Sequence, residues 1–388
     1  MTQHKPIPGA GLRDFLVREA VRGLSYLIGV KNITSIFWNR WRASMIGDAT
    51  IMEFLDRIDS LDNWTPAAMA IVEREEAELA ASESRLEVGE RVGKLRRLSY
   101  LCHLAQWGSL DMTEGKKAAY RKSRDYYVQA EQLAHGDLYH RVGIPWQGKT
   151  IFGNLHLPAG MTGRVPLVVL IHGMDDSKEE HLVSEQAARE GGLAYFCFDG
   201  PGQAEAVYLD GMLWTRDFEP VVERVITYVC DHFPCDPERI GLLGISWGGF
   251  WAVRTAAVDR RVRAVYDLGG PIDSLPDYLK LPYFLKARFA QILDVDDLEQ
   301  LRLLTGGIHL RDDALLDRVR CPVRIVHGDK DPIVKLSDKA WLAKKLSDLH
   351  AAQEVSLVVH KNGDHCCTGY AAEIREDSLA FFQRVLAG

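Results

Sequence analysis

Long hydrophobic runs, basic tails and low-complexity tracts are all missing from this sequence of 388 residues. The longest apolar runs, such as residues 165–171, fall far short of the roughly 20 residues that cross a bilayer. We therefore expect no membrane span. The formal net charge is −7, from 54 acidic and 47 basic residues, and no basic stripe stands out. This balance argues against nucleic acid as a main partner.

Cysteine is scarce, and its number excludes a fully paired disulfide framework. The seven cysteines are scattered through the chain, as is typical of reduced thiols in a cytoplasmic protein. The first eight residues also lack the apolar segment and small-residue cleavage site of a secretory signal. We expect a cytoplasmic location.

The composition, 47% hydrophobic and 26% charged, is that of a globular protein with room for a large core and a second domain. From about residue 10 to 134, apolar residues recur at spacings of three and four. This pattern predicts a helical N-terminal domain over residues 1–135. Thr65-Pro66 marks one helix start there, with Thr65 as the capping residue and Pro66 at the first helical position.

Residues 136–388 change character and predict an α/β domain. After two strand-like segments, 138–142 and 150–157, short apolar runs alternate with amphipathic helices. The runs cover residues 167–171, 194–198, 240–245, 262–268, 323–326 and 355–359. Such runs indicate a mostly parallel central sheet with flanking helices. Prolines and aromatic residues interrupt the pattern at about 270–312, where we expect a cap insertion.

Gly244-Ile245-Ser246-Trp247-Gly248 matches the pattern G-x-S-x-G. The pentapeptide alone occurs often by chance, but here it follows a strand and opens a helical run, residues 250–256. A sharp strand-to-helix turn lifts the serine hydroxyl out at the top of a sheet. Ser246 is therefore the candidate nucleophile, and a glycine-rich turn with an incidental serine is the alternative.

A serine nucleophile needs a base to take its proton and a carboxylate to orient that base. The strand 323–326 ends in a turn that contains Asp329 and Asp331, and the strand 355–359 leads to His365. We predict His365 as the general base and Asp331 as the acid, with Asp329 as its competitor. Asp331 as the cap of the next helix and His365 as an ordinary loop histidine are the alternatives.

Acyl transfer also needs donors for the oxyanion of the transition state. The amide of Trp247, directly after the serine, is one expected donor. Met174, which follows His172-Gly173 after the strand 167–171, is the other. A tight turn without catalytic meaning is the alternative for His172-Gly173.

Cys366-Cys367 lies beside His365, and this pattern suggests a metal site or a cysteine nucleophile. No further Cys or His pair at ligand spacing accompanies it, and no phosphate-binding glycine loop is present in the sequence. We expect neither a metal nor an organic cofactor.

Because of the motifs around His172, Ser246, Asp331 and His365, residues 137–388 resemble the α/β-hydrolase superfamily. Residues 178–180, residues 199–203 and the long helical N-terminal part are similar to one branch of it. That branch contains 2,6-dihydroxypseudooxynicotine hydrolase and the fungal polyketide chain-shortening hydrolases, with the FrsA-like esterases nearby. The resemblance implies a helical region that packs with the cap over the site. It also implies a small ketone, β-diketone or polyketide-like substrate, aromatic or not, cleaved at a carbon–carbon bond.

The same resemblance raises two further expectations. Some relatives use an additional acid from the cap region, for which Asp273 and Asp277 are the candidates, although solvated cap positions are the simpler interpretation of both. Helical domains of this kind often support a homodimer. Ala204 departs from the pattern of many relatives, which have glycine before the glutamate at position 205.

Three other functions remain open for the same residues. A carboxylesterase or thioesterase would use the same triad on simple acyl substrates. An acyltransferase or cyclase would use it but exclude water. A binding module on this fold would have no need for a complete triad.

Overall fold

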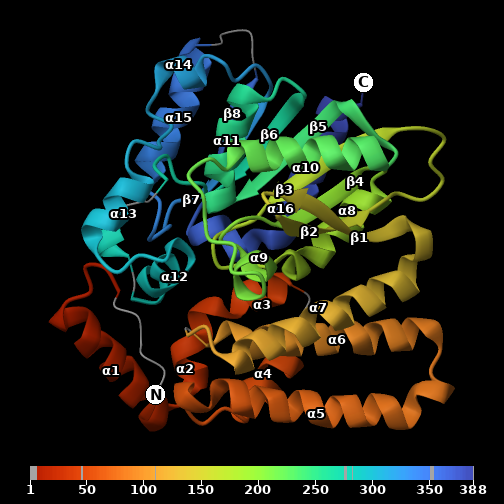
Figure 1. Ribbon diagram of the computed structural model, residues 1–388, viewed down its shortest axis with the longest axis vertical. Helices are drawn as coiled ribbons and strands as arrows, with labels where there is room; N and C mark the ends of the chain where they lie inside the picture. Colours follow the sequence, from red (N-terminus) through yellow and green to blue (C-terminus); the bar gives the residue numbers. More distant parts are fainter. Residues whose placement is uncertain are drawn as a thin grey trace. The chain divides into compact units, whose positions relative to one another are not determined.

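The computed structural model describes residues 7–44, 47–109, 111–274, 278–281, 283–349 and 354–387. The chain divides into two compact units (Figure 1). Unit 1 combines Met1–His140 with Pro282–Leu298, and unit 2 combines Arg141–Leu281 with Glu299–Gly388. The segment in which the sequence places a cap insertion is thus shared between the two units. That any of it acts as a cap stays a prediction.

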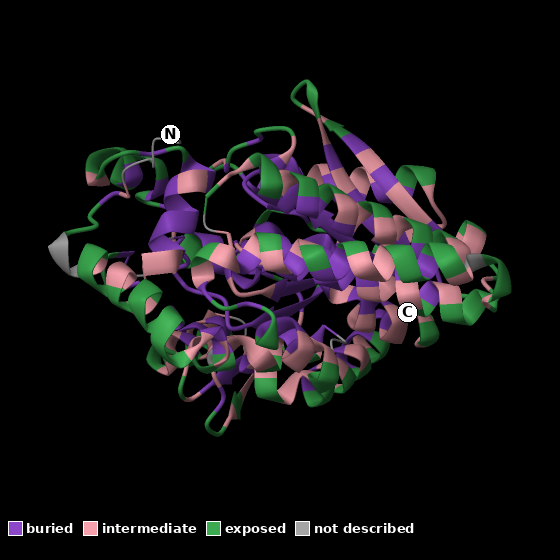
Figure 2. Cartoon of the chain, turned by 90° about the horizontal axis from the view of Figure 1, so that it is seen from below, coloured by how far each residue is buried: buried purple, intermediate pink, exposed green. Residues whose placement is uncertain are grey.

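Unit 1 is built from helices. Its helices are α1 (Leu12–Ile28), α2 (Val30–Thr34), α3 (Trp38–Ala43), α4 (Asp48–Asp56), α5 (Trp64–Ser82), α6 (Val88–Trp107), α7 (Glu114–His135) and α12 (Tyr283–Leu293). Exposed and buried residues alternate along the long helices, as the three-to-four spacing of their apolar residues predicts (Figure 2). The core includes a group of tryptophans, in which the ring centroids of Trp64 and Trp41 lie 6.2 Å apart. The Trp64 indole also donates a hydrogen bond to the Leu104 carbonyl at 2.7 Å.

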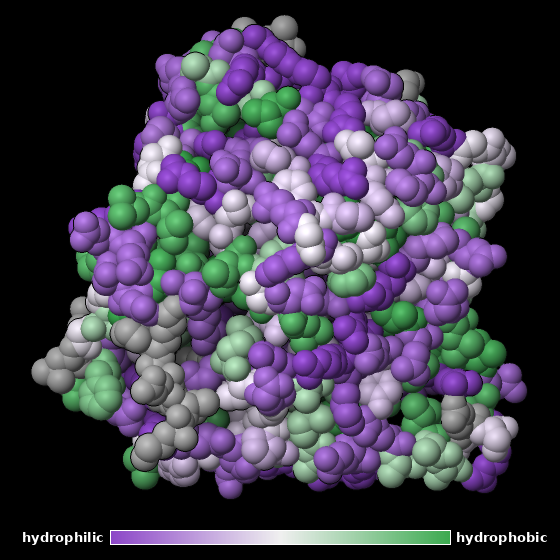
Figure 3. All heavy atoms as spheres, viewed as in Figure 1, coloured by the Kyte–Doolittle hydropathy of each residue, from purple (hydrophilic) through white to green (hydrophobic). Residues whose placement is uncertain are grey.

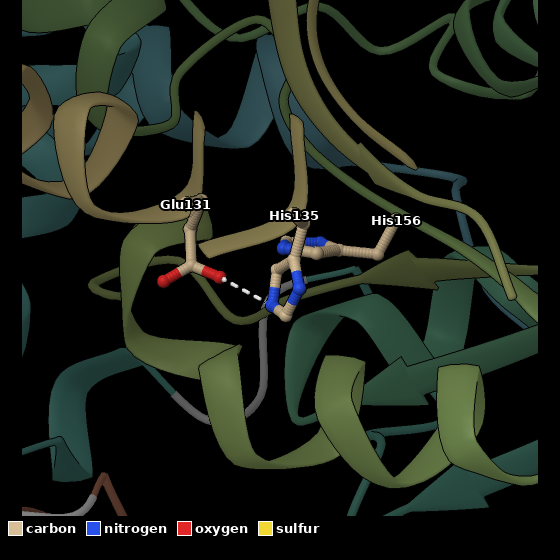
Figure 4. Close-up of side chains that lie close together, drawn as sticks. All are labelled: Glu131, His135 and His156. Carbon is tan, nitrogen blue, oxygen red and sulfur yellow. Dashed lines mark ion pairs between the residues drawn. The ribbon is translucent and has the colours of Figure 1, made fainter. Parts of the chain in front are cut away.

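A buried charge pair links two of these helices. Glu131 on α7 accepts hydrogen bonds from Arg96 on α6 at 2.7 and 3.1 Å, and His135 lies 3.4 Å from the same carboxylate (Figure 4). Because Arg96 balances the charge of a fully buried Glu131, the pair joins α6 to α7 without leaving an uncompensated charge.

Unit 2 contains an eight-stranded sheet in the order β1-β2-β4-β3-β5-β6-β7-β8. The strands are β1 (Tyr139–Trp146), β2 (Lys149–His156), β3 (Val165–Ile171), β4 (Ala194–Asp199), β5 (Cys235–Ile245), β6 (Val262–Leu268), β7 (Val323–Gly328) and β8 (Val355–His360). β2 runs antiparallel to β4, and the strands from β4 to β8 pair in parallel. The mostly parallel sheet predicted from the apolar runs is confirmed.

Helices flank this sheet on both faces (Figure 1). The helices that follow one another through this part of the chain are α8 (Leu182–Glu190), α9 (Ala204–Tyr208), α10 (Glu219–His232), α11 (Trp247–Val258), α13 (Leu298–Thr305), α14 (Asp313–Leu316), α15 (Leu336–Leu349) and α16 (Ala371–Leu386). α8 and α16 pack on one face, whereas α10 and α11 pack on the other. Strands covered on both faces must be apolar throughout, which explains why residues 167–171 are all buried.

The surface agrees with the composition. On the face shown in Figure 3, hydrophilic residues predominate and apolar residues occur between them. Within the described ranges, no helix has the length and apolar character needed to cross a membrane.

Candidate active site

Ser246 lies at the turn between β5 and α11, with backbone angles of φ 53° and ψ −123°. This left-handed conformation is strained for a residue with a Cβ and holds the side chain away from both flanking elements. The turn is crowded, because a Cβ on Gly248 would collide with the Ile171 carbonyl and one on Gly244 with the backbone of Gly248 and Gly249. The two glycines of the motif are therefore required by space.

His365 and Asp331 both reach this serine from the ends of neighbouring strands. His365 follows β8, and its Nε2 lies 2.8 Å from the Ser246 hydroxyl oxygen. Its Nδ1 lies 2.8 Å from Asp331 Oδ2, in the turn after β7. Since a carboxylate can only accept, Nδ1 carries the proton of the neutral ring, and Nε2 is left to accept from the serine.

Asp331 is held as a carboxylate by its surroundings. Its Oδ1 accepts hydrogen bonds from the amides of Ile333 at 2.7 Å and Val334 at 2.9 Å. Burial alone would raise the pKa of Asp331, but the hydrogen bond from His365, its charge and these two amides outweigh burial and lower the pKa.

The pKa of His365 shifts in the opposite direction. Burial alone would lower it, yet interactions with the adjacent Cys366 and with the Asp331 carboxylate raise the pKa well above its ordinary value of 6.5. A raised pKa suits a group that must hold a proton while a negative charge develops nearby.

The loop after β3 lies against Ser246. A Cβ placed on Gly173 would be 3.4 Å from the Ser246 Cβ, so the backbone of this loop passes directly beside the serine. Met174 follows Gly173 and is buried, and Trp247 is the first residue of α11. The Trp247 indole donates to the Ser274 carbonyl at 2.6 Å and stacks on Trp214, with ring centroids 5.4 Å apart.

The other candidates from the sequence lie elsewhere. Asp329 uses its Oδ1 to accept from the Asn362 amide at 2.6 Å, which fixes the turn before His365. Asp273 forms an isolated bridge with His309 and lies 3.8 Å from Arg311, in a partly exposed position. Asp277 is outside the described residues.

The two adjacent cysteines are free thiols. Both adopt left-handed backbone conformations, with φ 59° at Cys366 and 50° at Cys367. Burial raises the pKa of Cys367 to about 12, and it also raises the pKa of Cys366 against the opposing charge of His365. Neither thiol favours the thiolate form that a nucleophile or metal ligand needs.

A family model described as the alpha/beta hydrolase family matches residues 168–376, which is more than half of the chain. The chain belongs to the alpha/beta hydrolase family. The matched range contains the serine turn, the Asp331 turn and His365.

Named relatives agree with this family. The alpha/beta hydrolase is 33% identical over 215 residues to 2,6-dihydropseudooxynicotine hydrolase of Paenarthrobacter nicotinovorans, which covers 55% of each chain. It is 36% identical over 129 residues to 20-hydroxy-prefusarin hydrolase of Gibberella moniliformis, covering 31% of this chain and 30% of the relative. The matches thus span about half of the curated relatives' length, or less.

Solved structures extend the likeness. The crystal structure of 2,6-dihydroxy-pseudo-oxynicotine hydrolase has a TM-score of 0.76 at 26% identity and covers 90% of this chain and 95% of that one. AbyA5 wild type has a TM-score of 0.68 at 18% identity, over 87% of this chain and 90% of that one, and shares the fold. The branch of the superfamily suggested by the motifs is confirmed by these matches.

The alpha/beta hydrolase also contains a buried charge cluster that the sequence analysis did not identify. Lys178 is fully buried, and its Nζ lies 2.8 Å from carboxylate oxygens of Glu179, Asp199 and Glu205. Arg141 on β1 lies 2.5 Å from the second oxygen of Glu205. Oxygens of the three acids lie within 4.8 Å of one another, as in a cation site, but the Lys178 ammonium is the cation among them.

The charge of Lys178 is stabilised by its neighbours, whereas burial raises the pKa of Glu179. Burial alone would lower the pKa of Lys178, but its three carboxylate neighbours raise the pKa well above the ordinary value. The available sequence signal was the position of two charged residues at the carboxyl ends of strands: Asp199 is the last residue of β4, and Lys178 follows the loop after β3. Charged residues at such an edge are a reason to expect a polar site rather than a surface.

Proposed function

We propose that this protein is a serine hydrolase that cleaves a carbon–carbon bond of a small ketone, β-diketone or polyketide-like molecule. The observation that carries the proposal is the relay from Ser246 Oγ to His365 Nε2 and from His365 Nδ1 to Asp331, each at 2.8 Å. The names of the relatives, which are hydrolases of a pseudooxynicotine and of a prefusarin, support a small-molecule substrate.

In the proposed reaction, the Ser246 oxygen attacks the substrate carbonyl while His365 takes the serine proton. The amides of Trp247 and Met174 hold the oxyanion of the tetrahedral intermediate. Collapse breaks the bond between the carbonyl carbon and its α-carbon, and the electron pair leaves as an enolate-like carbanion. His365 returns the proton to this carbon. Water, deprotonated by His365, then releases the acid from the acyl-serine.

A carboxylesterase or thioesterase follows the same steps with an oxygen or sulfur leaving group. The difference lies in the leaving group, because an enolate needs a proton donor more than a thiolate does.

Asp273 remains a proposed additional acid, and Asp277 falls outside the described residues. A homodimer also stays a proposal, which light scattering in solution tests. A cytoplasmic location is proposed from the seven free thiols.

The test is intact mass after treatment with a fluorophosphonate, with the labelled peptide mapped. We expect one adduct on Ser246, no adduct on Ser246→Ala, and normal labelling of the control Ser378→Ala, which removes a buried hydroxyl of α16. Absence of labelling in folded wild-type protein contradicts the proposal. It would favour a binding module on the same fold.

A parallel substrate panel decides the bond type. Esters, thioesters and β-diketones are compared by kcat/KM, and hydroxylamine is added to reveal acyl transfer. A carbon–carbon hydrolase is expected to prefer the β-diketones and to cleave esters slowly. The opposite preference assigns the protein to the esterases, and trapping in place of hydrolysis assigns it to the acyltransferases.

A further inference from the structure

His172 is buried in the loop that carries the proposed oxyanion donor, and the nearest hydrogen-bond partner of each ring nitrogen is an oxygen acceptor. Nδ1 lies 2.9 Å from the Gly173 carbonyl oxygen, and Nε2 lies 2.9 Å from Asp199 Oδ1. A neutral imidazole has one N–H and therefore donates only one of these hydrogen bonds. An imidazolium donates both.

Both carboxylate oxygens of Asp199 accept hydrogen bonds, which leaves no position for a proton on the carboxyl group. Its Oδ1 accepts from the Lys178 amide at 2.9 Å as well as facing His172. Its Oδ2 accepts from Lys178 Nζ at 2.8 Å and from the Glu205 amide at 3.0 Å. Burial alone would raise the pKa of Asp199, but Lys178 and His172 outweigh it and lower the pKa. Asp199 is therefore a carboxylate that requires donors on both oxygens.

The hydrogen bond to Gly173 bears directly on the oxyanion donor. In a trans peptide the carbonyl of one residue and the amide of the next point in opposite directions. The Gly173 carbonyl and the Met174 N–H belong to the same peptide, so fixing the carbonyl on His172 fixes the direction of the N–H. A positive donor on the carbonyl also polarises the peptide and strengthens its N–H as a donor.

Gln203 adds a second restraint to the same loop. Its Nε2 lies 2.8 Å from the His172 carbonyl oxygen, and it lies 3.3 Å from both the Gly173 carbonyl oxygen and His172 Nδ1. The two N–H groups of this amide are matched by the two carbonyl oxygens, so neither is needed by Nδ1. Its Oε1 accepts from the Gly200 amide at 2.9 Å, which fixes the orientation of the side-chain amide. The loop is thus tied to the turn after β4 through two side chains, Gln203 and Asp199.

We propose that His172 is an imidazolium at neutral pH and that it positions and polarises the Met174 amide of the oxyanion hole, with Asp199 and Gln203 holding it in place. The proposal rests on the proposed function, because it assumes that an oxyanion forms beside Ser246. His172 is a positioning residue, since it acts through the peptide and does not touch the substrate.

The charge of His172 depends on the groups around it. The groups that face His172 itself are Asp199 on β4, Asp176 in the same loop and the stacked ring of His181, whose centroid lies 5.8 Å away. The charged groups around Asp199 are Lys178 and Glu179 of the 3-10 helix Lys178–His181 and Glu205 on α9. Burial alone would lower the pKa of His172, but Asp199 and Asp176 outweigh burial and raise the pKa.

The first experiment measures the ring charge directly. Protein labelled with 15N-histidine is studied by long-range heteronuclear NMR, and the His172 signals are assigned by their loss in His172→Gln. We expect both ring nitrogens of His172 to have protonated shifts at pH 8, where an ordinary histidine is neutral. One protonated and one unprotonated nitrogen at pH 8 overturns the proposal.

The second experiment measures the consequence for the nucleophile. The rate constant of fluorophosphonate labelling is expected to fall roughly ten- to a hundredfold in His172→Gln. The matched control is His156→Gln, which replaces another fully buried histidine, 3.6 Å from Glu185, and is expected to keep the wild-type rate. An unchanged rate in folded His172→Gln overturns the proposal.

The pH profile separates positioning from simple folding support. In the wild type the labelling rate should fall at the alkaline pH at which the NMR signals of His172 lose a proton. That decrease should be absent from the profile of His172→Gln, which has no such proton. A decrease that persists in the variant contradicts the assignment.

Two further results are interpreted as follows: a His172→Gln variant that does not fold, and a wild type that is not labelled. If His172→Gln does not fold, Gln203→Met removes the second restraint while leaving the ring, and it should slow labelling severalfold with the His172 ring still protonated. If the wild type itself does not label, the proposed function and the role in the oxyanion hole both fail. The NMR result then still decides whether His172 is charged.

Discussion

At the scale of single residues, the candidate site combines backbone strain with closely matched hydrogen bonds. Ser246 is held at a φ of 53°, and its hydroxyl meets His365 at 2.8 Å. Strain of this kind costs on the order of 1–3 kcal/mol and persists only where the surrounding packing enforces it. Here the enforcing contacts are those of Gly244 and Gly248, where the backbones leave no room for a Cβ.

The pH dependence of the nucleophile is a prediction at this scale. His365 acts as a base only when neutral, so its raised pKa places the rise of the labelling rate at a higher pH than an ordinary histidine would. Asp331→Asn removes a charge that favours the imidazolium, and the midpoint of this rise should move to lower pH. The plateau should also fall roughly a thousandfold or more, because the orienting carboxylate is lost.

The control for this experiment is Asp329→Asn, two residues away. Asp329 accepts a hydrogen bond from the Asn362 amide and has no contact with His365 among the hydrogen bonds described above. We expect its profile to overlay that of the wild type. A midpoint that stays in place in Asp331→Asn would show that another group sets the acidic limb.

At the scale of elements, parallel strands bring the proposed catalytic groups to one edge of the sheet. β5 ends directly before Ser246, and β7 and β8 lead into the loops that carry Asp331 and His365. One helix is fixed to this edge by a buried ion pair, in which Lys339 of α15 contacts Asp267 of β6 and donates to the Gly270 carbonyl at 2.6 Å. The pair connects α15 to the loop that follows β6.

Removal of one partner of this pair should be costly. Lys339→Met leaves the fully buried Asp267 carboxylate without its counter-charge and should lower the free energy of unfolding by about 3–5 kcal/mol. The double variant with Asp267→Asn should recover part of the loss, since no charge is then left uncompensated. Urea unfolding monitored by circular dichroism measures these changes.

Lys345→Met on the same helix is the matched control. Lys345 lies 2.7 Å from Asp313, but that carboxylate is largely exposed to water, so the expected change is below about 1 kcal/mol. Equal losses in the two lysine variants would contradict a special role for the buried pair.

At the scale of the whole molecule, the chain crosses between its two units more than once. α12 lies in sequence between parts of the sheet unit but groups with the N-terminal helices. Within unit 1, Lys286 lies 3.0 Å from Asp14, and Arg288 donates to the Trp107 carbonyl at 2.8 Å. Residues 282–298 therefore depend on residues far away in the sequence for their partners.

This dependence predicts the result of truncation. A protein of residues 138–388 retains α12 but loses the helices it packs on, so it should expose apolar surface, bind a hydrophobic dye and aggregate. Replacing residues 282–298 by a short glycine-serine linker in the same truncated protein should reduce both effects. Size-exclusion chromatography with dye binding compares the two, and identical behaviour would contradict the grouping of α12 with unit 1.

Individual elements show where sequence reasoning succeeded and where it failed. The six apolar runs predicted β3 to β8. The inner strands are covered on both faces and leave little room for polar residues, whereas the edge strand β8 is only partly buried. The predicted capping role of Thr65 was wrong. α5 already begins at Trp64, Ser60 accepts from the Asn63 amide at 3.3 Å, and the Thr65 hydroxyl donates to the Ala105 carbonyl at 2.9 Å. The Thr65 hydroxyl, which the local pattern assigned to a helix cap, instead forms its hydrogen bond with a carbonyl 40 residues away in the sequence.

The sequence by itself determined the sheet, the serine turn and the two strand ends that supply Asp331 and His365. These features follow from local periodicity and from turns that need particular residues. Only the tertiary structure brought Asp331 and not Asp329 into contact with His365, placed α12 with the N-terminal helices, and gathered His172, Lys178 and Asp199 into one buried cluster. Buried charges are stable only beside partners from other segments, and no local pattern contains that information.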